Sequence, residues 1–374
     1  MSEPANSDWR ELFRPIQEGD RGTAITLYTV RRHGEPWLVL PAASPLAAQA
    51  LVLYPAQSSK ARWARRALHG ALRIGLKPRL ERTQLVLSVA DPFVKFLRNS
   101  ARLASTQPFQ FALLAGNPRA AGRRHVLLVF GPDGRPAVVI KAGASAAAGE
   151  LISKEREFLR NVPAALPGVP QLRGDFNEGN VQALALDCFP GQSPGSNETA
   201  EFHRVMNGWL FHNRSTNLNQ LEVWRRLLAA GRENPLPPAV QSLGELQLCP
   251  ALFHGDFAPW NIKSDRGRWT VLDWERGEIS GPPAWDWFHF ILQPALLVRR
   301  EKPTALLERF EQLLGAPDFA GYARTAGLAQ GQHRRALGLA YLAYCLNVTR
   351  QTEGAAELRA LFQIASNRWG DLKT

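Results

Sequence analysis

The chain has 374 residues, of which 45% are hydrophobic and 21% charged, so it is long enough for two or three domains and a sizeable buried core. Its three cysteines, Cys188, Cys249 and Cys345, lie far apart and form no Cys-x-x-Cys pair, which argues against a disulfide framework and a zinc site. The formal net charge is +12, and residues 1–105 contribute +8 of it, with 16 Lys and Arg against 8 Asp and Glu.

The chain start has neither a basic segment nor an apolar core, so no signal peptide is expected. The most apolar run, Phe288–Val298, is interrupted by His289, Gln293 and Pro294 and is too short to span a bilayer. We therefore expect a cytoplasmic protein without a transmembrane segment.

Residues 1–105 are expected to form a small basic α/β unit of unknown role. Runs rich in Val, Leu, Thr and Tyr predict strands, and helices are expected between them. The predicted strands are Ala24–Val30, Pro36–Leu40, Leu51–Tyr54 and Gln84–Val89, and the predicted helices are 58–75 and Pro92–Leu103.

The stretch 60–82 is the most basic part of the chain. It has one acidic residue, Glu81, against eight basic ones: Lys60, Arg62, Arg65, Arg66, Arg73, Lys77, Arg79 and Arg82. Such a patch can attract an anionic partner, whether nucleic acid, anionic lipid or an acidic glycan, although a solvated helix face is the simpler interpretation. We do not expect nucleic acid, because no stacking platform or nucleic-acid motif accompanies the charge.

From about residue 107 the pattern changes to a β-meander. Three apolar runs, Phe109–Leu114, His125–Phe130 and the one that ends in Lys141, are followed by a helix over 147–160 and a strand over Val181–Leu186. Beyond 191–199 the chain reads as mostly helical. We therefore predict an α+β fold with a small β-rich lobe over 106–190 and a larger helical lobe over 191–374, preceded by the basic unit 1–105.

One segment indicates a catalytic site: His254-Gly255-Asp256-Phe-Ala-Pro-Trp-Asn261, followed by Asp273. A carboxylate that accepts a hydroxyl proton, then an amide and a second carboxylate that hold Mg²⁺, form the working set for phosphoryl transfer from a nucleotide. The turn residues Ser264-Asp265-Arg266-Gly267 predict a hairpin that returns Asp273 to the side of Asn261. His254 is expected to hold the loop by hydrogen bonds.

Lys141 closes an apolar strand, where it could hold the α- and β-phosphates of a nucleotide. It needs a carboxylate partner on the next helix. Glu155 is the first choice, and Glu157 and Glu150 are alternatives. The competing interpretation is a strand-end lysine that reaches solvent.

Together, His254-Gly255-Asp256 through Asn261 and Leu272-Asp273-Trp274-Glu275 resemble the aminoglycoside phosphotransferase and choline kinase family, whose fold is similar to that of protein kinases. The resemblance covers about residues 107–350. It implies ATP and Mg²⁺ as cofactors, with Asp256 as catalytic base, Asn261 and Asp273 as metal ligands and Lys141 with Glu155 as the phosphate-holding pair. It also implies a hinge at 187–191, where Asp187 and Phe189 meet adenine, and a bracing role for Asp286.

Two features depart from this family pattern: the phosphate-covering loop and the basic first hundred residues, which the resemblance does not explain. The loop 115–122 lacks the Gly-x-Gly-x-x-Gly of protein kinases, and GTP stays open as an alternative nucleotide. The tryptophans that crowd the catalytic region suggest either a cation–π box for a quaternary ammonium or hydrophobic packing; they are Trp260, Trp269, Trp274, Trp285 and Trp287. The scarcity of acidic residues in 200–250, the expected acceptor region, and the net charge favour a neutral or anionic sugar over a polycation.

The predicted function is ATP- and Mg²⁺-dependent transfer of the γ-phosphate to a hydroxyl of a small molecule: a sugar, an amino alcohol or a glycan-linked hydroxyl. The alternative is a catalytically weak, kinase-like regulatory protein that docks through its basic N-terminal unit. A protein kinase ranks lowest, because Asp286 follows Asp273 by only 13 residues and leaves little room for an activation loop.

Overall fold

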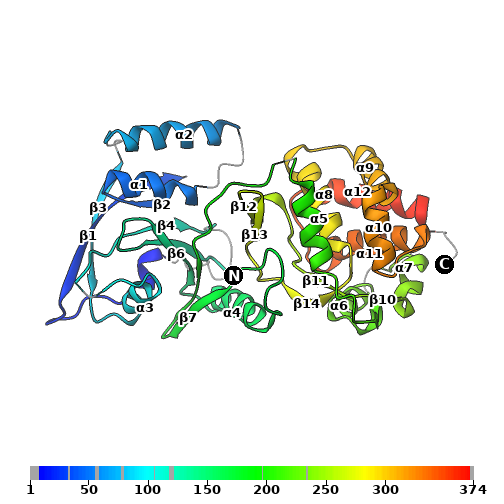
Figure 1. The fold of residues 1–374 in the computed structure, drawn as a ribbon, viewed down its shortest axis with the longest axis horizontal. Coiled ribbons are helices and arrows are strands. Elements are labelled where there is room, and N and C mark those ends of the chain that lie inside the picture. Colours follow the sequence, from blue (N-terminus) through cyan, green and yellow to red (C-terminus); the bar gives the residue numbers. More distant parts are fainter. Residues whose placement is uncertain are drawn as a thin grey trace. The chain divides into compact units, whose positions relative to one another are not determined.

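The computed structural model describes residues 8–32, 34–54, 59–76, 80–104, 106–117, 122–195, 197–232 and 235–370. The chain divides into two compact units (Figure 1). Unit 1 comprises Met1–Arg160 and Pro170–Pro190, and unit 2 comprises Asn161–Val169 and Gly191–Thr374. Each unit is described by itself.

Unit 1 is built on one eight-stranded sheet with the strand order β3-β1-β2-β4-β5-β6-β8-β7, and all its neighbouring pairs are antiparallel. The strands are β1 (Gly22–Arg32), β2 (Glu35–Pro41), β3 (Glu81–Ser88), β4 (Phe111–Ala115), β5 (His125–Phe130), β6 (Pro136–Gly143), β7 (Leu172–Glu178) and β8 (Val181–Asp187). Because β2 pairs with β4, the first hundred residues extend the sheet of the lobe that follows. The boundary expected near residue 105 lies within this sheet, and a separate role for 1–105 stays a prediction.

Two apolar cores lie on opposite faces of this sheet. In β5, Leu127 and Val129 join one core while Leu128 and Phe130 join the other, because successive side chains of a strand point to opposite faces. Helix α3 (Pro92–Ser100) covers the first face, together with the 3-10 helix Trp9–Leu12. Helices α1 (Ser44–Ala50) and α2 (Ser59–Arg73) cover the second face, and α4 (Ala146–Asn161) follows β6 (Figure 1).

The prediction of a strand at Leu51–Tyr54 was wrong. Leu51–Leu53 is a 3-10 helix that continues α1, which the sequence analysis did not predict. Helix α1 begins with Ser44 and Pro45, and proline is favoured in the first turn of a helix. Leu51 is buried in the second core in this helical conformation, so its apolar character did not distinguish a strand from a helix.

Unit 2 is mostly helical, as predicted. Its helices are α5 (Thr199–Gly208), α6 (Glu222–Ala230), α7 (Pro238–Gln241), α8 (Trp285–Gln293), α9 (Pro303–Gly315), α10 (Pro317–Thr325), α11 (Gly331–Asn347) and α12 (Ala355–Trp369). Its short strands β9 (Thr216–Asn217), β10 (Gln247–Leu248), β11 (Ala251–Phe253), β12 (Ile262–Asp265), β13 (Arg268–Val271) and β14 (Glu278–Gly281) form two-stranded sheets. In the described residues, no helix has both the length and the apolar character that crossing a membrane requires.

The predicted hairpin before Asp273 is present as β12 and β13. Asp265 pairs with Arg268, and the two residues between them, Arg266 and Gly267, both have positive φ, at 51° and 74°. Positive φ at both central positions is the geometry of the two-residue turn that matches the twist of a hairpin. The fold class, a β-rich unit joined to a helical one, is confirmed.

Candidate active site

The loop after β11 is held by a buried carboxylate from α8. Asp286 accepts the backbone N–H of His254 at 2.6 Å and that of Gly255 at 3.1 Å. Gly255 has φ +77°, and a Cβ at this position would meet the Cβ of Arg276 at 3.0 Å, so the turn favours glycine. Burial raises the pKa of Asp286 to about 7 against these two hydrogen bonds. Asp286 therefore fixes the loop backbone, which is the bracing role that the sequence analysis gave it.

His254 holds the loop from inside. Its Nδ1 accepts the N–H of Asp256 at 3.1 Å, and its Nε2 lies 2.9 Å from the carbonyl oxygen of Leu272, to which it donates. One ring nitrogen thus accepts and the other donates, which requires the neutral ring with its proton on Nε2. Burial agrees with this state, because it lowers the pKa of His254 to about 4.

The carboxylate of Asp256 is held at both oxygens. Oδ2 accepts a hydrogen bond from Nδ2 of Asn261 at 2.9 Å, and Oδ1 lies 3.0 Å from Nε2 of His289. Burial by itself favours the neutral acid, but the hydrogen bond with His289 and the positive charge of Arg276 oppose burial, and the pKa of Asp256 lies below its ordinary value. Because 34% of its side chain stays accessible, an ionised Asp256 can meet an incoming hydroxyl.

Asn261 and Asp273 are brought together by the hairpin. The N–H of Leu272 donates to the carbonyl oxygen of Asn261 at 2.7 Å, so Asp273 directly follows a residue bonded to Asn261. The amide nitrogen of Asn261 also donates to the Asp256 carbonyl at 2.8 Å, so the amide oxygen is the atom of this side chain that could bind a metal ion. Asp273 has φ 74°, an uncommon conformation that Asp tolerates better than most residues.

The donor set suits Mg²⁺. An amide oxygen and a carboxylate are hard ligands, and Mg²⁺ commonly takes only one or two protein carboxylates together with phosphate oxygens and water. No group of three or more His, Cys, Asp or Glu residues in the described ranges is arranged for a metal ion. A site completed by phosphate oxygens therefore fits these residues better than an all-protein cage.

Unit 1 contains the second part of the predicted set. Nζ of Lys141, on β6, lies 2.7 Å from both carboxylate oxygens of Glu155, on α4, and both residues are buried. Lys141 is therefore not a lysine that reaches solvent. Of the two alternatives, Glu150 pairs with Lys154 on its own helix.

The predicted nucleotide hinge lies at the end of β8. Asp187 closes this strand and forms an ion pair with Arg173, and Phe189 is half-buried two residues later. Of the predicted phosphate loop 115–122, residues 118–121 lie outside the described part of the chain. The adenine contacts of Asp187 and Phe189 stay predictions.

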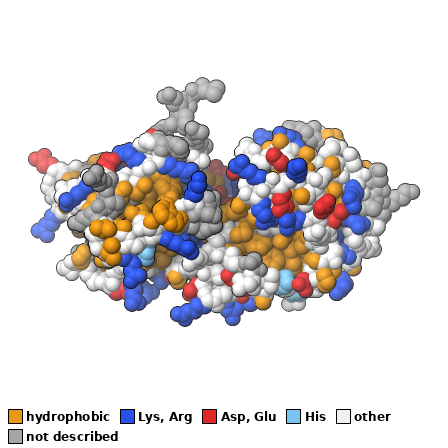
Figure 2. Space-filling model, turned by 90° about the horizontal axis from the view of Figure 1, so that it is seen from above, with side chains coloured by type: hydrophobic (Ala, Val, Ile, Leu, Met, Phe, Trp, Pro, Cys, Tyr) orange, Lys and Arg blue, Asp and Glu red, His pale blue; other side chains and the backbone are white. Residues whose placement is uncertain are grey.

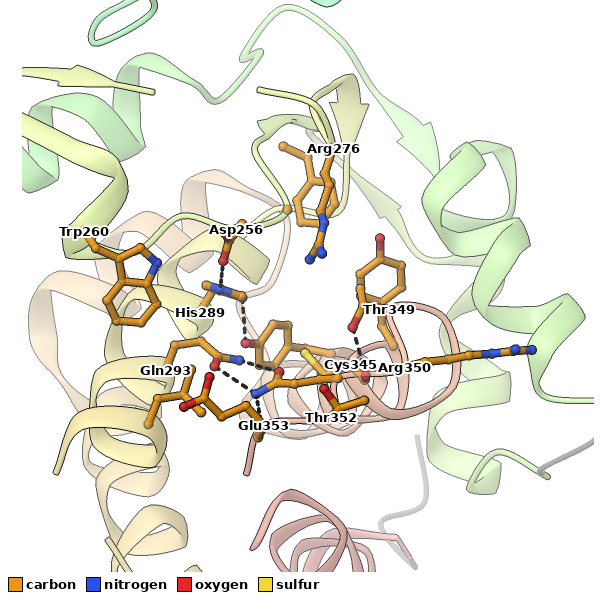
Figure 3. Close-up of a pocket in the computed structure, with 16 residues that line it drawn as sticks. Asp256, Trp260, Arg276, His289, Gln293, Cys345, Thr349, Arg350, Thr352 and Glu353 are labelled. Atoms are coloured by element: carbon orange, nitrogen blue, oxygen red, sulfur yellow. Dashed lines mark hydrogen bonds and ion pairs between the residues drawn. The ribbon is translucent and has the colours of Figure 1, made fainter. Parts of the chain in front are cut away.

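A cavity of about 280 Å³ lies beside Asp256 within unit 2 (Figure 3). Arg276 extends into its open space, and Trp260 stands at one side. The amides of Gln293 and Gln351 bond each other at 2.9 and 3.1 Å in its wall. Its lining residues come from 253–353 and none from 200–250, where the sequence analysis placed the acceptor region.

Sequence reasoning missed two groups that act on Asp256. His289 bonds it directly (Figure 3), and the hydroxyl of Tyr341 lies 3.1 Å from Nδ1 of His289. Burial raises the pKa of Tyr341 well above its ordinary value, so this hydroxyl stays protonated beside Nδ1. His289 follows Asp286 by three residues on α8, and this Asp-x-x-His spacing on one helical face was the available signal.

Most of the tryptophans near the site serve packing. Trp269, Trp274, Trp285 and Trp287 are buried, and Trp274 and Trp287 make edge-on contacts with Trp209 and Phe202. Trp260 is the member of the group that lines the cavity. A box of several tryptophans for a quaternary ammonium is therefore not present in the described residues.

A β-rich unit with a buried Lys–Glu pair and a helical unit with a braced His-Gly-Asp loop define a kinase that acts on small molecules. Comparison with family models agrees, since the model described as "Phosphotransferase enzyme family" (APH) matches residues 126–328. The chain belongs to this phosphotransferase family. A comparison with the curated proteins found no match.

Several solved structures are similar to the chain at low identity. A thermostable mutant of aminoglycoside phosphotransferase APH(4)-Ia, in a ternary complex with ADP and hygromycin B, shares 15% identity with a TM-score of 0.44, over 75% of this chain and 99% of that one. A putative fructosamine-3-kinase from Haemophilus somnus 129PT shares 12% identity with a TM-score of 0.42, over 72% of this chain and 95% of that one. The streptomycin–ATP–APH(2")-IIa complex shares 10% identity with a TM-score of 0.40, over 73% and 96%.

Proposed function

We propose that the chain transfers the γ-phosphate of ATP, with Mg²⁺, to a hydroxyl of a small molecule, with Asp256 as the base. The observation that carries the proposal is the carboxylate of Asp256, which is fixed at both oxygens by Asn261 and His289 and faces a cavity. Phosphoryl transfer depends mainly on positioning and charge stabilisation, and this arrangement supplies the positioning. Because ATP is the donor, we place the protein in the cytoplasm.

The other residues take supporting roles in this proposal. Asp256 accepts the hydroxyl proton as the bond to phosphorus forms. Asn261 and Asp273 would hold Mg²⁺, which neutralises charge on the phosphates when bound. The Lys141–Glu155 pair of unit 1 supports a role in holding the α- and β-phosphates, since the ion pair fixes the position of the ammonium group.

The chemistry of the cavity supports a sugar-like acceptor over an amino alcohol. Gln293, Gln351 and Thr352 offer hydrogen-bonding groups for hydroxyls, and Trp260 offers a flat apolar face. Arg276 makes no hydrogen bond or ion pair with another described residue, yet its charge acts on Asp256 and Tyr344. A guanidinium at this point repels a cationic acceptor and attracts one that bears a phosphate or carboxylate. The regulatory alternative receives no support, because the catalytic residues are intact.

The test combines a substrate panel with one substitution. We expect purified protein with Mg·ATP to release ADP in the presence of sugars, and faster with sugar phosphates or sugar acids than with choline or ethanolamine. Asp256→Asn should lower kcat by about 10²- to 10⁴-fold, because it removes the base, while Mg·ATP affinity measured by calorimetry stays the same. The same panel with GTP decides between the two nucleotides.

Asp265→Asn is the matched control, because Asp265 is an exposed carboxylate on the turn of the same hairpin. It should leave turnover unchanged. If Asp256→Asn kept wild-type turnover, or if Mg·ATP bound without any phosphorylated product across the panel, the proposed reaction would be wrong.

A further inference from the structure

Helix α2 is attached to unit 1 by one narrow face. Its sequence, SKARWARRALHGALR, contains five Lys and Arg and no acidic residue. Leu72 is buried and Leu68 is partly buried in the core that includes Ala47 and Leu51 of the α1 region. Leu68 and Leu72 are one helical turn apart, so they account for the attachment and leave the opposite face uncovered by the described residues.

That opposite face is apolar. Trp63, Ala67, Gly70 and Ile74 follow each other at spacings of four, three and four residues, which places them on one side of the helix. Trp63 is 73% exposed and Ile74 is 75% exposed, and Leu76, just beyond the helix, is 59% exposed. Large apolar side chains this exposed contribute nothing to the core of unit 1, so the fold itself does not explain them.

Basic side chains border this apolar stripe. Arg66 and Arg73 are exposed and lie along one flank with exposed His69 between them, and exposed Lys60 precedes them. The acid nearest in sequence, Glu81, is engaged in an ion pair with Arg31. Figure 2 looks down on the side of unit 1 that carries α2, in the left part of the picture, and shows a hydrophobic area with Lys and Arg side chains around it.

We propose that α2 and the segment through Leu76 dock on the surface of an anionic lipid bilayer. A helix lying in the interface needs an apolar face with aromatic and aliphatic residues, and Lys and Arg beside it to meet anionic headgroups. Trp63 matches the level of the headgroups, where tryptophan is enriched, and Ile74 and Leu76 reach the acyl chains. The inference does not rest on the kinase reaction.

A bilayer fits this face better than nucleic acid does. Ile74 and Leu76 gain by leaving water for hydrocarbon but have no partner on a phosphate backbone. Nucleic-acid binding would use the cations and could stack one base on Trp63, and would leave the two aliphatic side chains in solvent. The two partners are therefore distinguished by whether vesicle binding needs the apolar side chains as well as the basic ones.

The test is co-sedimentation of the full chain with vesicles. We expect binding to vesicles of phosphatidylcholine with about a third phosphatidylglycerol, weaker binding at high salt, and little binding to phosphatidylcholine alone. Trp63→Ser with Ile74→Ser should weaken binding by about tenfold or more, and Arg66→Glu with Arg73→Glu should do the same. Melting temperature and far-ultraviolet circular dichroism establish that each variant is folded.

Arg324→Glu with Arg359→Glu is the matched control, since it makes the same charge change at exposed positions on α10 and α12. This pair should bind vesicles like wild type. Equal binding to neutral and anionic vesicles, or an equal loss in the control pair, would overturn the proposal. So would binding to RNA or DNA that needs Arg66 and Arg73 while the folded Trp63→Ser, Ile74→Ser variant still binds vesicles normally.

Discussion

At the scale of single residues, Asp256 depends on one neighbour that is close in sequence and on one that is distant. Asn261 holds one of its oxygens at 2.9 Å and His289 lies 3.0 Å from the other. The hydroxyl of Tyr341 in turn lies 3.1 Å from the far nitrogen of His289, so the ring is held at both ends. This chain of hydrogen bonds makes His289 a positioning residue for Asp256 rather than a group that reacts itself.

We predict that His289→Ala lowers kcat on the order of 10- to 100-fold, because Asp256 loses the donor that orients one of its oxygens. The same bond lowers the pKa of Asp256, so its loss should move the acidic limb of the kcat profile to higher pH. Steady-state kinetics across pH measure both effects.

His289→Gln is the informative comparison, since its amide nitrogen can replace Nε2 as the donor to Asp256. It should recover most of the activity. Equal losses for His289→Ala and His289→Gln, with an unshifted pH profile, would show that His289 serves packing alone.

Asp286 and His254 make opposite contributions to the pH dependence of the free energy of unfolding. The pKa of Asp286 is raised from 3.8 to about 7 by burial, so in that range the folded chain holds the extra proton and the free energy of unfolding falls as pH rises. The pKa of His254 is lowered from 6.5 to about 4 by burial, so there the unfolded chain holds the extra proton and the free energy of unfolding rises with pH. The two effects oppose each other between about pH 4 and 6.5.

Asp286→Asn should therefore change the pH dependence of stability as well as its level. Asparagine offers one acceptor for two N–H groups, so we expect a loss of about 1–3 kcal/mol in the free energy of unfolding. Between about pH 4 and 6.5, where the effect of His254 is then unopposed, the variant should gain stability more steeply than wild type, by up to about 1.4 kcal/mol per pH unit. Urea denaturation at several pH values measures this, and parallel curves would contradict it.

Sequence reasoning reached the residues of this site that lie in one short segment. Asp256, Asn261 and Asp273 are joined by a hairpin whose turn residues are readable, so their proximity was predictable. His289 and Tyr341 come from α8 and α11, and only the packing of these helices brings them to Asp256. Glu155 was the first choice from the sequence as the partner of Lys141, and in the structure it forms that ion pair, whereas Glu150 pairs with Lys154.

At the scale of elements, most strands of unit 1 and its helices α2, α3 and α4 were predictable from the sequence, whereas unit 2, apart from the hairpin before Asp273, was predicted only as mostly helical. The wrong and missing predictions share a cause, because the local sequence pattern of a strand or helix does not reveal which other elements pack against it. Strand β7 was missed since it is an edge strand whose residues are mostly part-exposed and read LRGDFNE. The connection of the first hundred residues to the rest, through β2 and β4, was likewise not visible in the sequence.

This connection leads to a prediction about residues 1–105. A chain that starts at residue 106 lacks β2, so the edge of β4 around Leu113 and Leu114 loses its partner. It also lacks the aromatic cover of Phe111, since Trp9, Phe13 and Phe93 are gone. We expect this shortened chain to aggregate, as measured by size-exclusion chromatography and thermal melting.

A chain that starts at residue 8 is the control, because it keeps the described elements, and it should stay monodisperse. A folded, monodisperse chain from 106 to 374 would instead support the expected domain boundary at 105 and show that the first strands are dispensable.

At the scale of the whole molecule, most of the net positive charge and the candidate catalytic residues lie in different parts of the sequence. The first 105 residues contribute +8 of the net charge of +12, whereas the catalytic candidates all follow residue 140. A basic region of this kind raises the local concentration of anionic partners and makes association dependent on ionic strength. Substrate assays and vesicle assays should therefore be compared at the same salt concentration.

The sheet that the first hundred residues form together with the rest of unit 1 matters for protein engineering. The family match begins at residue 126, inside β5, and stops at 328, before α11, whose residues 336–345 are all buried. A gene fragment trimmed to the match would cut a central strand and delete a helix from the middle of unit 2. Swaps with other family members should place their junctions in exposed connections, and any shuffling library guided by the match alone would yield mostly unfolded products.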